Sequence, residues 1–241
     1  MRTEDEIKIK INETLYTAMV DECGAGPLCG DLVVAAVILD PNNPIVGLND
    51  SKKLTEKKRE LLYPQIIEKA LDYCIIHISP KEIDKINIFQ ARMLGMKMAV
   101  EGLKRVDYAV IDGNKIPQGL LVEADYVIKG DAKIEGIGAA SILAKVSRDR
   151  YMLEKAKEFP QYQFEKHKGY GTKLHYEMLD KYRDRFISFG GHSAACGFTI
   201  DAAGMEKLRD DLNRDIRMKL EEKPDLLDEI HASDAEISAD D

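Results

Sequence analysis

The sequence lacks any apolar run that approaches the roughly 20 residues of a membrane-spanning helix. Its first six residues are highly charged, so we expect no secretory signal there. Of its 241 residues, 44% are hydrophobic and 32% are charged, as in ordinary soluble globular proteins. These features predict no membrane partner and one large domain, or one domain with an appendage.

Cysteine is scarce, and the four cysteines (Cys23, Cys29, Cys74 and Cys196) do not have the close spacing of a metal site. No CxxC pair is present. Free cysteines are commonly buried, so this pattern favours buried thiols over ligands. It is consistent with a reducing compartment, and we expect a cytoplasmic protein.

An excess of positive charge is also missing, since the formal net charge is −8. The segment 222–241 holds eight acidic residues and one lysine, so it accounts for −7 of this charge. The remaining chain is nearly neutral and can still present a basic face, so a nucleic-acid partner is not excluded. We expect 222–241 to be an acidic disordered tail, because it has few large apolar side chains.

Apolar periodicity predicts strands that alternate with helices, which is typical of the α/β class. We expect strands near 15–21, 31–39, 72–79, 108–112 and 122–128. Helices are expected near 55–70, 88–104, 134–157, 173–182 and 205–220, and residues 79–82 should open a further short helix. Thr55 and Ser79 are expected N-caps, and Pro80 suits a first helical position. The first two strands are joined by a turn, so part of the sheet should be antiparallel.

A stripe of apolar residues at helical spacing in 88–104 predicts a core-facing helix surface: Phe89, Met93, Met96, Val100 and Leu103. Small residues in 134–157 suggest that this helix packs closely against a neighbour.

Four acids occur where predicted strands end. Asp21 and Glu22 close the first strand and precede a glycine-rich turn, while Asp112 and Asp131 follow two later strands. Acids at a strand end are commonly solvated, but four that gathered together would repel each other without a cation. Hard divalent cations prefer oxygen ligands, so no histidine is needed. The pattern therefore predicts a site for two Mg²⁺ or Mn²⁺ ions, as in two-metal phosphoryl transfer.

Five segments, in order, resemble the motifs of the ribonuclease HII family over about residues 15–183. They are Asp21-Glu22-x-Gly24-x-Gly26-Pro27-Leu28-x-Gly30 with Val33 to Ala36, Leu48 to Leu54, Ile111 to Asn114, Lys129 to Ala132 with Ala139 to Asp149, and His167 to Thr172. The resemblance implies an RNase H-like mixed sheet flanked by helices, with a helical C-terminal extension. We expect a catalytic domain over 1–186, an atypical segment over 187–221 and the tail over 222–241.

The resemblance further implies a Mg²⁺- or Mn²⁺-dependent endonuclease that acts as a monomer. It would cut the RNA strand of RNA–DNA hybrids. It would also nick duplex DNA on the 5′ side of an embedded ribonucleotide, leaving a 3′-hydroxyl and a 5′-phosphate. Carried over to this sequence, Asp21, Glu22, Asp112 and Asp131 are the catalytic, metal-binding acids.

The same resemblance assigns nucleic-acid contacts. Backbone groups of Gly24, Ala25 and Gly26 would approach the ribose 2′-hydroxyl, which distinguishes RNA from DNA. Tyr170 would stack beneath the next sugar, or else pack in the core.

Ser51, Lys52 and Lys53 would hold phosphates, with an ordinary solvated loop as the alternative. Lys145, Arg148 and Asp149 would line the groove, and a solvated helix face is an equal alternative.

The sequence departs from the family pattern in two places. The family's turn reads Gly-Arg-Gly, whereas this one has Ala25, so a charged phosphate contact is lost. Such contacts contribute roughly 1.5–3 kcal/mol, which predicts weaker binding at the ribonucleotide junction. The segment 188–220 weakly resembles the Gly-Gly-His region of DHH-type phosphoesterases. It is either a divergent loop or a phosphate-binding fragment at Gly190, Gly191 and His192.

Three functions remain open from the sequence. The first is a type 2 ribonuclease H. The second is a catalytically weakened protein that binds RNA–DNA hybrids with altered junction recognition, because Ala25 and the altered C-terminal region misplace the scissile phosphate. The third is an unrelated metal-dependent phosphatase or small-molecule enzyme.

Overall fold

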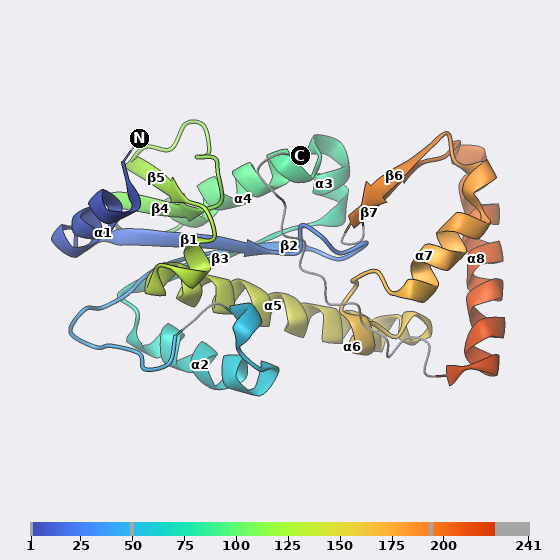
Figure 1. Cartoon of the computed structure of the whole chain (residues 1–241), viewed down its shortest axis with the longest axis horizontal. Coiled ribbons are helices and arrows are strands. Elements are labelled where there is room, and N and C mark those ends of the chain that lie inside the picture. Colours follow the sequence, from blue (N-terminus) through green and yellow to red (C-terminus); the bar gives the residue numbers. More distant parts are fainter. Residues whose placement is uncertain (1, 49–50, 193–194, 225–241) are drawn as a thin grey trace. The chain divides into compact units, whose positions relative to one another are not determined.

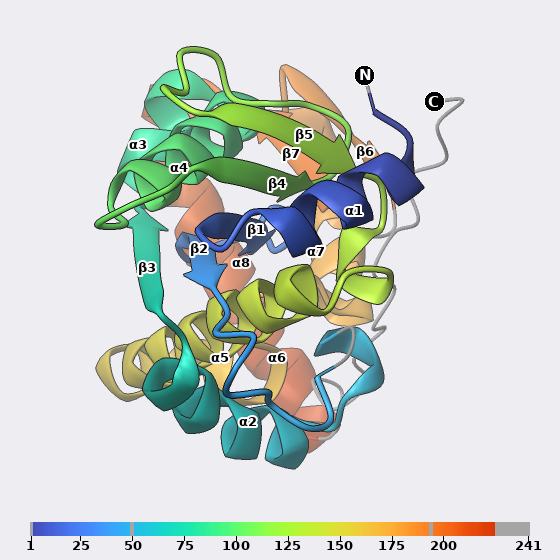
Figure 2. The ribbon, with the colours of Figure 1, turned by 90° about the vertical axis from the view of Figure 1, so that its left-hand side faces the viewer.

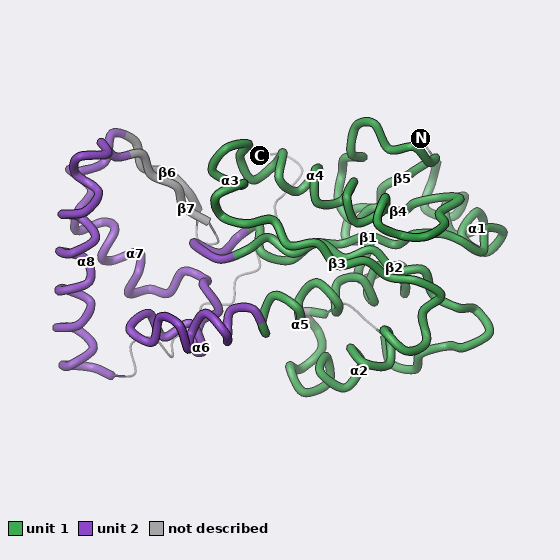
Figure 3. Tube along the Cα trace, turned by 180° about the vertical axis from the view of Figure 1, so that it is seen from behind, with its two compact units in different colours: residues 1–25, 31–150 green, residues 26–30, 151–241 purple. Residues whose placement is uncertain are grey.

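The computed structural model describes residues 2–48, 51–192 and 195–224. The backbone divides into two compact units (Figure 3). The first unit holds residues 1–25 and 31–150, and the second holds 26–30 and 151–241. The division into domains at 186 and 221 stays a prediction.

The first unit is built on a mixed sheet of five strands in the order β3-β2-β1-β4-β5. Its strands are β1 (Thr17–Cys23), β2 (Leu32–Ile38), β3 (Asp72–Ile78), β4 (Tyr108–Asp112) and β5 (Glu123–Val127). The strands β1, β2 and β3 pair antiparallel, and β4 runs parallel to both β1 and β5. The predicted mixed α/β sheet is therefore confirmed, with the antiparallel part where the short turn follows β1.

Helices cover both faces of this sheet (Figures 1 and 2). One face carries α3 (Pro80–Ile86) and α4 (Ile88–Glu101), and the other carries α2 (Glu56–Lys69) and the first part of α5 (Glu135–Glu158). Alternation along β1 sends Val20 into the core under α4 and Met19 into the core under α5. The N-terminal helix α1 (Glu4–Glu13) adds Ile7 to the α5 side.

The local signals that begin the helices operate as predicted. The Thr55 hydroxyl accepts a hydrogen bond from the Lys58 N–H at the start of α2. The Ser79 hydroxyl accepts one from the Glu82 N–H, and Pro80 occupies the first position of α3. These caps satisfy backbone N–H groups that have no partner within the helix.

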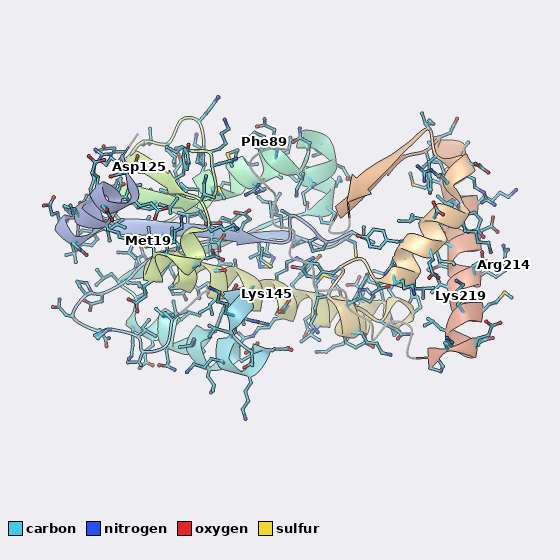
Figure 4. All side chains as sticks on the ribbon, viewed as in Figure 1. Met19, Phe89, Asp125, Lys145, Arg214 and Lys219 are labelled. Carbon is cyan, nitrogen blue, oxygen red and sulfur yellow. The ribbon has the colours of Figure 1, made fainter. Side chains whose placement is uncertain are left out.

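The apolar stripe of α4 is confirmed except at its first member. Met96, Val100 and Leu103 are buried against the sheet. Phe89, labelled in Figure 4, is 44% exposed, so its assignment to the core is wrong. It lies in the first turn of α4, next to the cap residue Asn87 and before the first buried residue, Ala91.

The second unit contains α6 (Phe164–His167), α7 (Lys173–Lys181), a hairpin of β6 (Ser188–His192) and β7 (Ala195–Thr199), and α8 (Ala202–Glu222). Leu174 and Met178 of α7 pack against Leu212 and Ile216 of α8, so the C-terminal extension is helical as expected. Residues 188–192 and 195–199 pair as antiparallel strands, where one interpretation of the sequence had a loop.

Two interpretations fall on parts that the structure leaves out. The phosphate contact proposed at Gly190, Gly191 and His192 depends on a His192 side chain that lies outside the description. Of the tail expected over 222–241, residues 225–241 lie outside the described residues. Four 3₁₀ turns complete the described elements: η1 (Ser51–Lys53), η2 (Gly130–Ala132), η3 (Pro160–Tyr162) and η4 (Arg183–Arg185). Within the described ranges, no helix combines the length and apolar character that crossing a membrane requires.

Candidate active site

The two acids that end β1 point to opposite faces of the sheet, because neighbouring strand residues alternate. Asp21 is 5% exposed and lies on the α5 face, where the Ser141 hydroxyl hydrogen-bonds its carboxylate. Glu22 lies on the α4 face, where Arg92 forms an ion pair with it. The Glu22 N–H also donates to Asp21 Oδ1 at 2.7 Å, so the strand end holds the Asp21 carboxylate in place.

Asp112 and Asp131 are linked through the turn that follows β5. Asp112 ends β4, and its Oδ1 accepts a 2.6 Å hydrogen bond from the N–H of Gly130. Asp131 follows in η2, and its Oδ1 accepts from the Ala132 N–H at 2.9 Å. The parallel pairing of β4 with β5 brings these two acids to one end of the sheet.

The four acids share one electrostatic environment. Burial is the largest cause that raises the pKa of Asp21 well above its usual value, and the charges of Asp112, Glu22 and Asp131 raise it further. The Ser141 hydrogen bond opposes this shift because it favours the charged carboxylate. Adding a cation would relieve the repulsion, and an all-carboxylate donor set suits Mg²⁺ or Mn²⁺.

The binding of metal ions by these four acids stays a prediction. Within the described part of the chain, no three His, Cys, Asp or Glu side chains are arranged to hold one metal ion. Protein groups engage each acid instead: Ser141 for Asp21, Arg92 for Glu22, and backbone N–H groups for the other two. The donor chemistry of the four carboxylates fits a divalent cation.

Sequence reasoning did not identify Arg92. It lies on α4 between Ala91 and Met93, and its ion pair leaves the Glu22 side chain only 11% exposed. The available signal was a charged residue within an otherwise apolar helix start. Such a residue needs a partner when the helix packs on a sheet.

The turn after β1 depends on a glycine and a buried arginine. Gly24 has φ +111°, and a Cβ there would lie 2.6 Å from both Arg148 Nε and the Asp31 carbonyl oxygen. Arg148 is completely buried, and its Nε donates to that carbonyl at 3.0 Å. The two interpretations of Arg148, as a groove residue or part of a solvated helix face, are therefore both wrong. It faces inward from α5 and supports the backbone beside Gly24.

Two neighbours of Arg148 on α5 differ from each other in exposure. Asp149 is also buried and forms a 3.1 Å ion pair with Lys145. Lys145, labelled in Figure 4, is partly exposed, so its side chain remains available for the contact with nucleic acid that we expect.

The loop that carries the expected phosphate ligands is anchored at both ends of η1. Ser51 is buried, and its hydroxyl lies 2.7 Å from the Ser141 hydroxyl. Arg59 of α2 donates to the carbonyl oxygens of Ser51 and Leu54 at 2.8 and 2.5 Å. Lys53 is exposed, while the side chain of Lys52 lies outside the description. Ser141 thus contacts both this loop and Asp21.

Two other expected contact residues belong to the second unit. Gly26 lies in its short segment 26–30, and Tyr170 follows α6. The Tyr170 N–H donates to the His167 carbonyl at 2.8 Å, and the Leu28 N–H donates to the Gly169 carbonyl at 2.9 Å. The Tyr170 side chain is half-buried, and its contact with a sugar stays a prediction.

Known proteins resemble this chain over most of its length. A family model described as Ribonuclease HII matches residues 18–186. The ribonuclease HII of Vibrio parahaemolyticus is 56% identical over 166 residues, which cover 68% of this chain and 78% of that protein. The ribonuclease HII of Shewanella oneidensis is 52% identical over 196 residues, covering 77% of this chain and 94% of that protein.

A solved structure agrees with these sequence matches. The crystal structure of ribonuclease H2 from Pyrococcus horikoshii aligns with a TM-score of 0.59 and 26% identity, over 83% of this chain and 98% of that one. The sequence matches and the shared RNase H-like fold lead to one conclusion: this chain belongs to the ribonuclease HII family of type 2 ribonuclease H endonucleases.

Proposed function

We propose that this chain cuts the RNA strand of RNA–DNA hybrids and nicks duplex DNA on the 5′ side of an embedded ribonucleotide, leaving a 3′-hydroxyl and a 5′-phosphate. The family is divalent-metal-dependent and acts on RNA–DNA hybrids. The observation that carries the proposal is the placement of four acids at the ends of β1 and β4 and in η2, where Asp21 is buried and the other three disfavour its charge. Such an arrangement is costly without a cation and is characteristic of functional sites.

Asp21, Glu22, Asp112 and Asp131 would hold Mg²⁺ or Mn²⁺ in this proposal. When bound, the ions supply Lewis-acid chemistry that activates water and stabilises charge on the phosphate oxygens. Ser141 orients the Asp21 carboxylate through its hydroxyl. The Gly130 N–H holds Asp112 at the end of β4, so this carboxylate enters the reaction already oriented.

The remaining assigned residues would position the nucleic acid. The backbone of Gly24, Ala25 and Gly26 would approach the 2′-hydroxyl, since a glycine turn allows close approach. Tyr170 would stack beneath the following sugar.

Phosphates would be held by Ser51, Lys52, Lys53 and Lys145, and such contacts set the register of a duplex without reading its sequence. The anchored η1 loop supports this assignment for the exposed Lys53, because Arg59 restrains its backbone.

The proposal is tested by cleavage of two substrates, a duplex with one ribonucleotide and an RNA–DNA hybrid, each in Mg²⁺ and in Mn²⁺. We expect nicking 5′ of the ribonucleotide and cutting of the hybrid, with both lost in Asp112→Asn. Cutting of the hybrid alone would show that junction recognition is absent. Hybrid binding without cleavage would instead favour the weakened binding protein.

The substitution Ala25→Arg forms a second arm of this experiment. Ala25 packs against the apolar cluster under α4 and carries no charge that could contact phosphate. We expect the arginine to strengthen binding at the junction by about one order of magnitude, the value of a charge-assisted hydrogen bond. If both proteins cleave all substrates equally, Ala25 does not weaken binding at the ribonucleotide junction.

A further inference from the structure

We propose that Arg92 is a built-in cation that competes with the divalent metal ion for Glu22. This inference rests on the proposed metal site, and it adds a residue to which no role is assigned. Removal of the Arg92 charge should therefore tighten metal binding, whereas the loss of a metal ligand or of a structural support weakens it.

The first observation is the position of Arg92 beside two of the four acids. One terminal nitrogen, Nη2, forms the ion pair with Glu22 Oε1. The same nitrogen lies 3.8 Å from the point where a Cβ on Gly113 would be, next to Asp112. The guanidinium thus lies between the end of β1 and the end of β4, where two of the four acids begin their side chains.

The second observation is the low solvent exposure of the ion pair between Arg92 and Glu22. The Glu22 side chain is 11% exposed and the Arg92 side chain 27% exposed, so the pair is only partly screened by water. Removing an arginine from such a carboxylate leaves a poorly solvated anion. A divalent cation would then gain more from Glu22 than it does when a guanidinium already neutralises it.

The hydrogen bonding of Arg92 shows why it can be displaced. Its Nε is buried and, among the described residues, has no hydrogen-bond partner. An unsatisfied donor makes this position less favourable for the guanidinium than one with every N–H paired. The partly exposed side chain therefore has a route toward solvent when Glu22 turns to a metal ion.

Neutral donors contact the other three acids. Asp112 and Asp131 accept hydrogen bonds from backbone N–H groups, and Asp21 from Ser141, all of which are neutral donors. A neutral donor can stay bonded to a carboxylate whose other oxygen binds a metal ion. A guanidinium within hydrogen-bond distance instead repels the incoming cation directly.

Titration of the full chain with Mn²⁺, followed by electron paramagnetic resonance of the free ion, measures this competition. We expect Arg92→Gln to lower the Kd for Mn²⁺ about tenfold, the smaller end of the effect of one charge-assisted hydrogen bond. Arg92→Lys should give a Kd between those of Arg92→Gln and the unmodified chain, because it keeps the charge and loses the planar fork. Lys97→Gln is the matched control, since Lys97 pairs with Glu101 at 3.7 Å on the same helix.

The outcomes separate the inference from the proposed function. An unchanged or higher Kd in Arg92→Gln overturns the inference, and so does an equal decrease in Lys97→Gln, which would reflect net charge alone. If Asp112→Asn binds Mn²⁺ as well as the unmodified chain, the proposed metal site itself is wrong.

Thermal unfolding provides a readout that does not depend on activity. In EDTA, Arg92→Gln should melt lower than the unmodified chain, because Glu22 has lost its counter-charge. Saturating Mn²⁺ should raise its Tm by more than that of the unmodified chain, since a ligand stabilises according to its affinity. An equal rise in Tm in both proteins would contradict competition between Arg92 and the metal ion. If Arg92→Gln does not fold, the same comparison of Tm in EDTA and in Mn²⁺ is made with Arg92→Lys.

Discussion

The turn after β1 makes Gly24→Ala a stringent test of the site's construction. Gly24 has φ +111°, and Gly113, beside Asp112, has nearly the same value of +112°. The two glycines therefore impose the same backbone penalty on an alanine. They differ in what a methyl group would meet, so the pair separates backbone strain from steric overlap.

The structure sets the two magnitudes. Alanine in this region of backbone conformation costs about 1–3 kcal/mol at either site. At Gly24 the methyl would also lie 2.6 Å from both Arg148 Nε and the Asp31 carbonyl oxygen, whereas at Gly113 it would lie 3.8 Å from Arg92 Nη2. Because Arg148 is fully buried and hydrogen-bonded to that carbonyl, neither neighbour can easily move. Overpacking should add about 1–3 kcal/mol at Gly24.

Urea unfolding followed by far-ultraviolet circular dichroism measures both losses, since the chain has no tryptophan to report by fluorescence. We expect Gly24→Ala to lose more free energy of unfolding than Gly113→Ala, by about 1–3 kcal/mol. Equal losses in the two variants would refute the rigid support of the turn by Arg148.

Two further predictions follow from buried polar groups. Ser141→Ala should cost about 1–3 kcal/mol in urea unfolding, because the buried Ser51 hydroxyl loses its partner at 2.7 Å. The double variant Ser51→Ala/Ser141→Ala should lose little more free energy of unfolding than Ser141→Ala alone. A loss equal to the sum of the two single losses would contradict the pairing of the two hydroxyls. His175, whose pKa burial lowers to about 4 from 6.5, is neutral in the folded chain, where its Nδ1 accepts from the Thr172 N–H at 3.1 Å. As the pH falls, the unfolded chain binds a proton at His175 before the folded chain does. The contribution of neutral His175 to the free energy of unfolding is therefore complete above about pH 6.5. It is lost as the pH falls toward 4, by up to about 3 kcal/mol. His175→Gln can keep the capping interaction and should flatten that pH dependence, and an unchanged slope would assign it to other groups.

The sequence alone determined the order and type of most elements, because their signals are local. Thr55 and Ser79 begin helices through hydrogen bonds to backbone groups three residues away. Short apolar runs marked the strands, and the acids at their ends could be named because a strand end is visible in the chain. The family resemblance rested on the same short segments.

Only the tertiary structure decided which charged residues face inward. Arg148 is buried beneath the Gly24 turn and Arg92 pairs with Glu22, although each stands in a helix where charge usually indicates solvent. Phe89 shows the converse case. It is apolar and has the spacing of the core stripe, but it stays exposed because its turn of α4 precedes the buried part of the helix. Helical spacing says which residues share a face, but the partner of that face comes from a distant part of the chain. The burial of a charge depends on such a partner. That is why the sequence named the four acids but missed Arg92, which pairs with Glu22, and misassigned Arg148, which supports the turn.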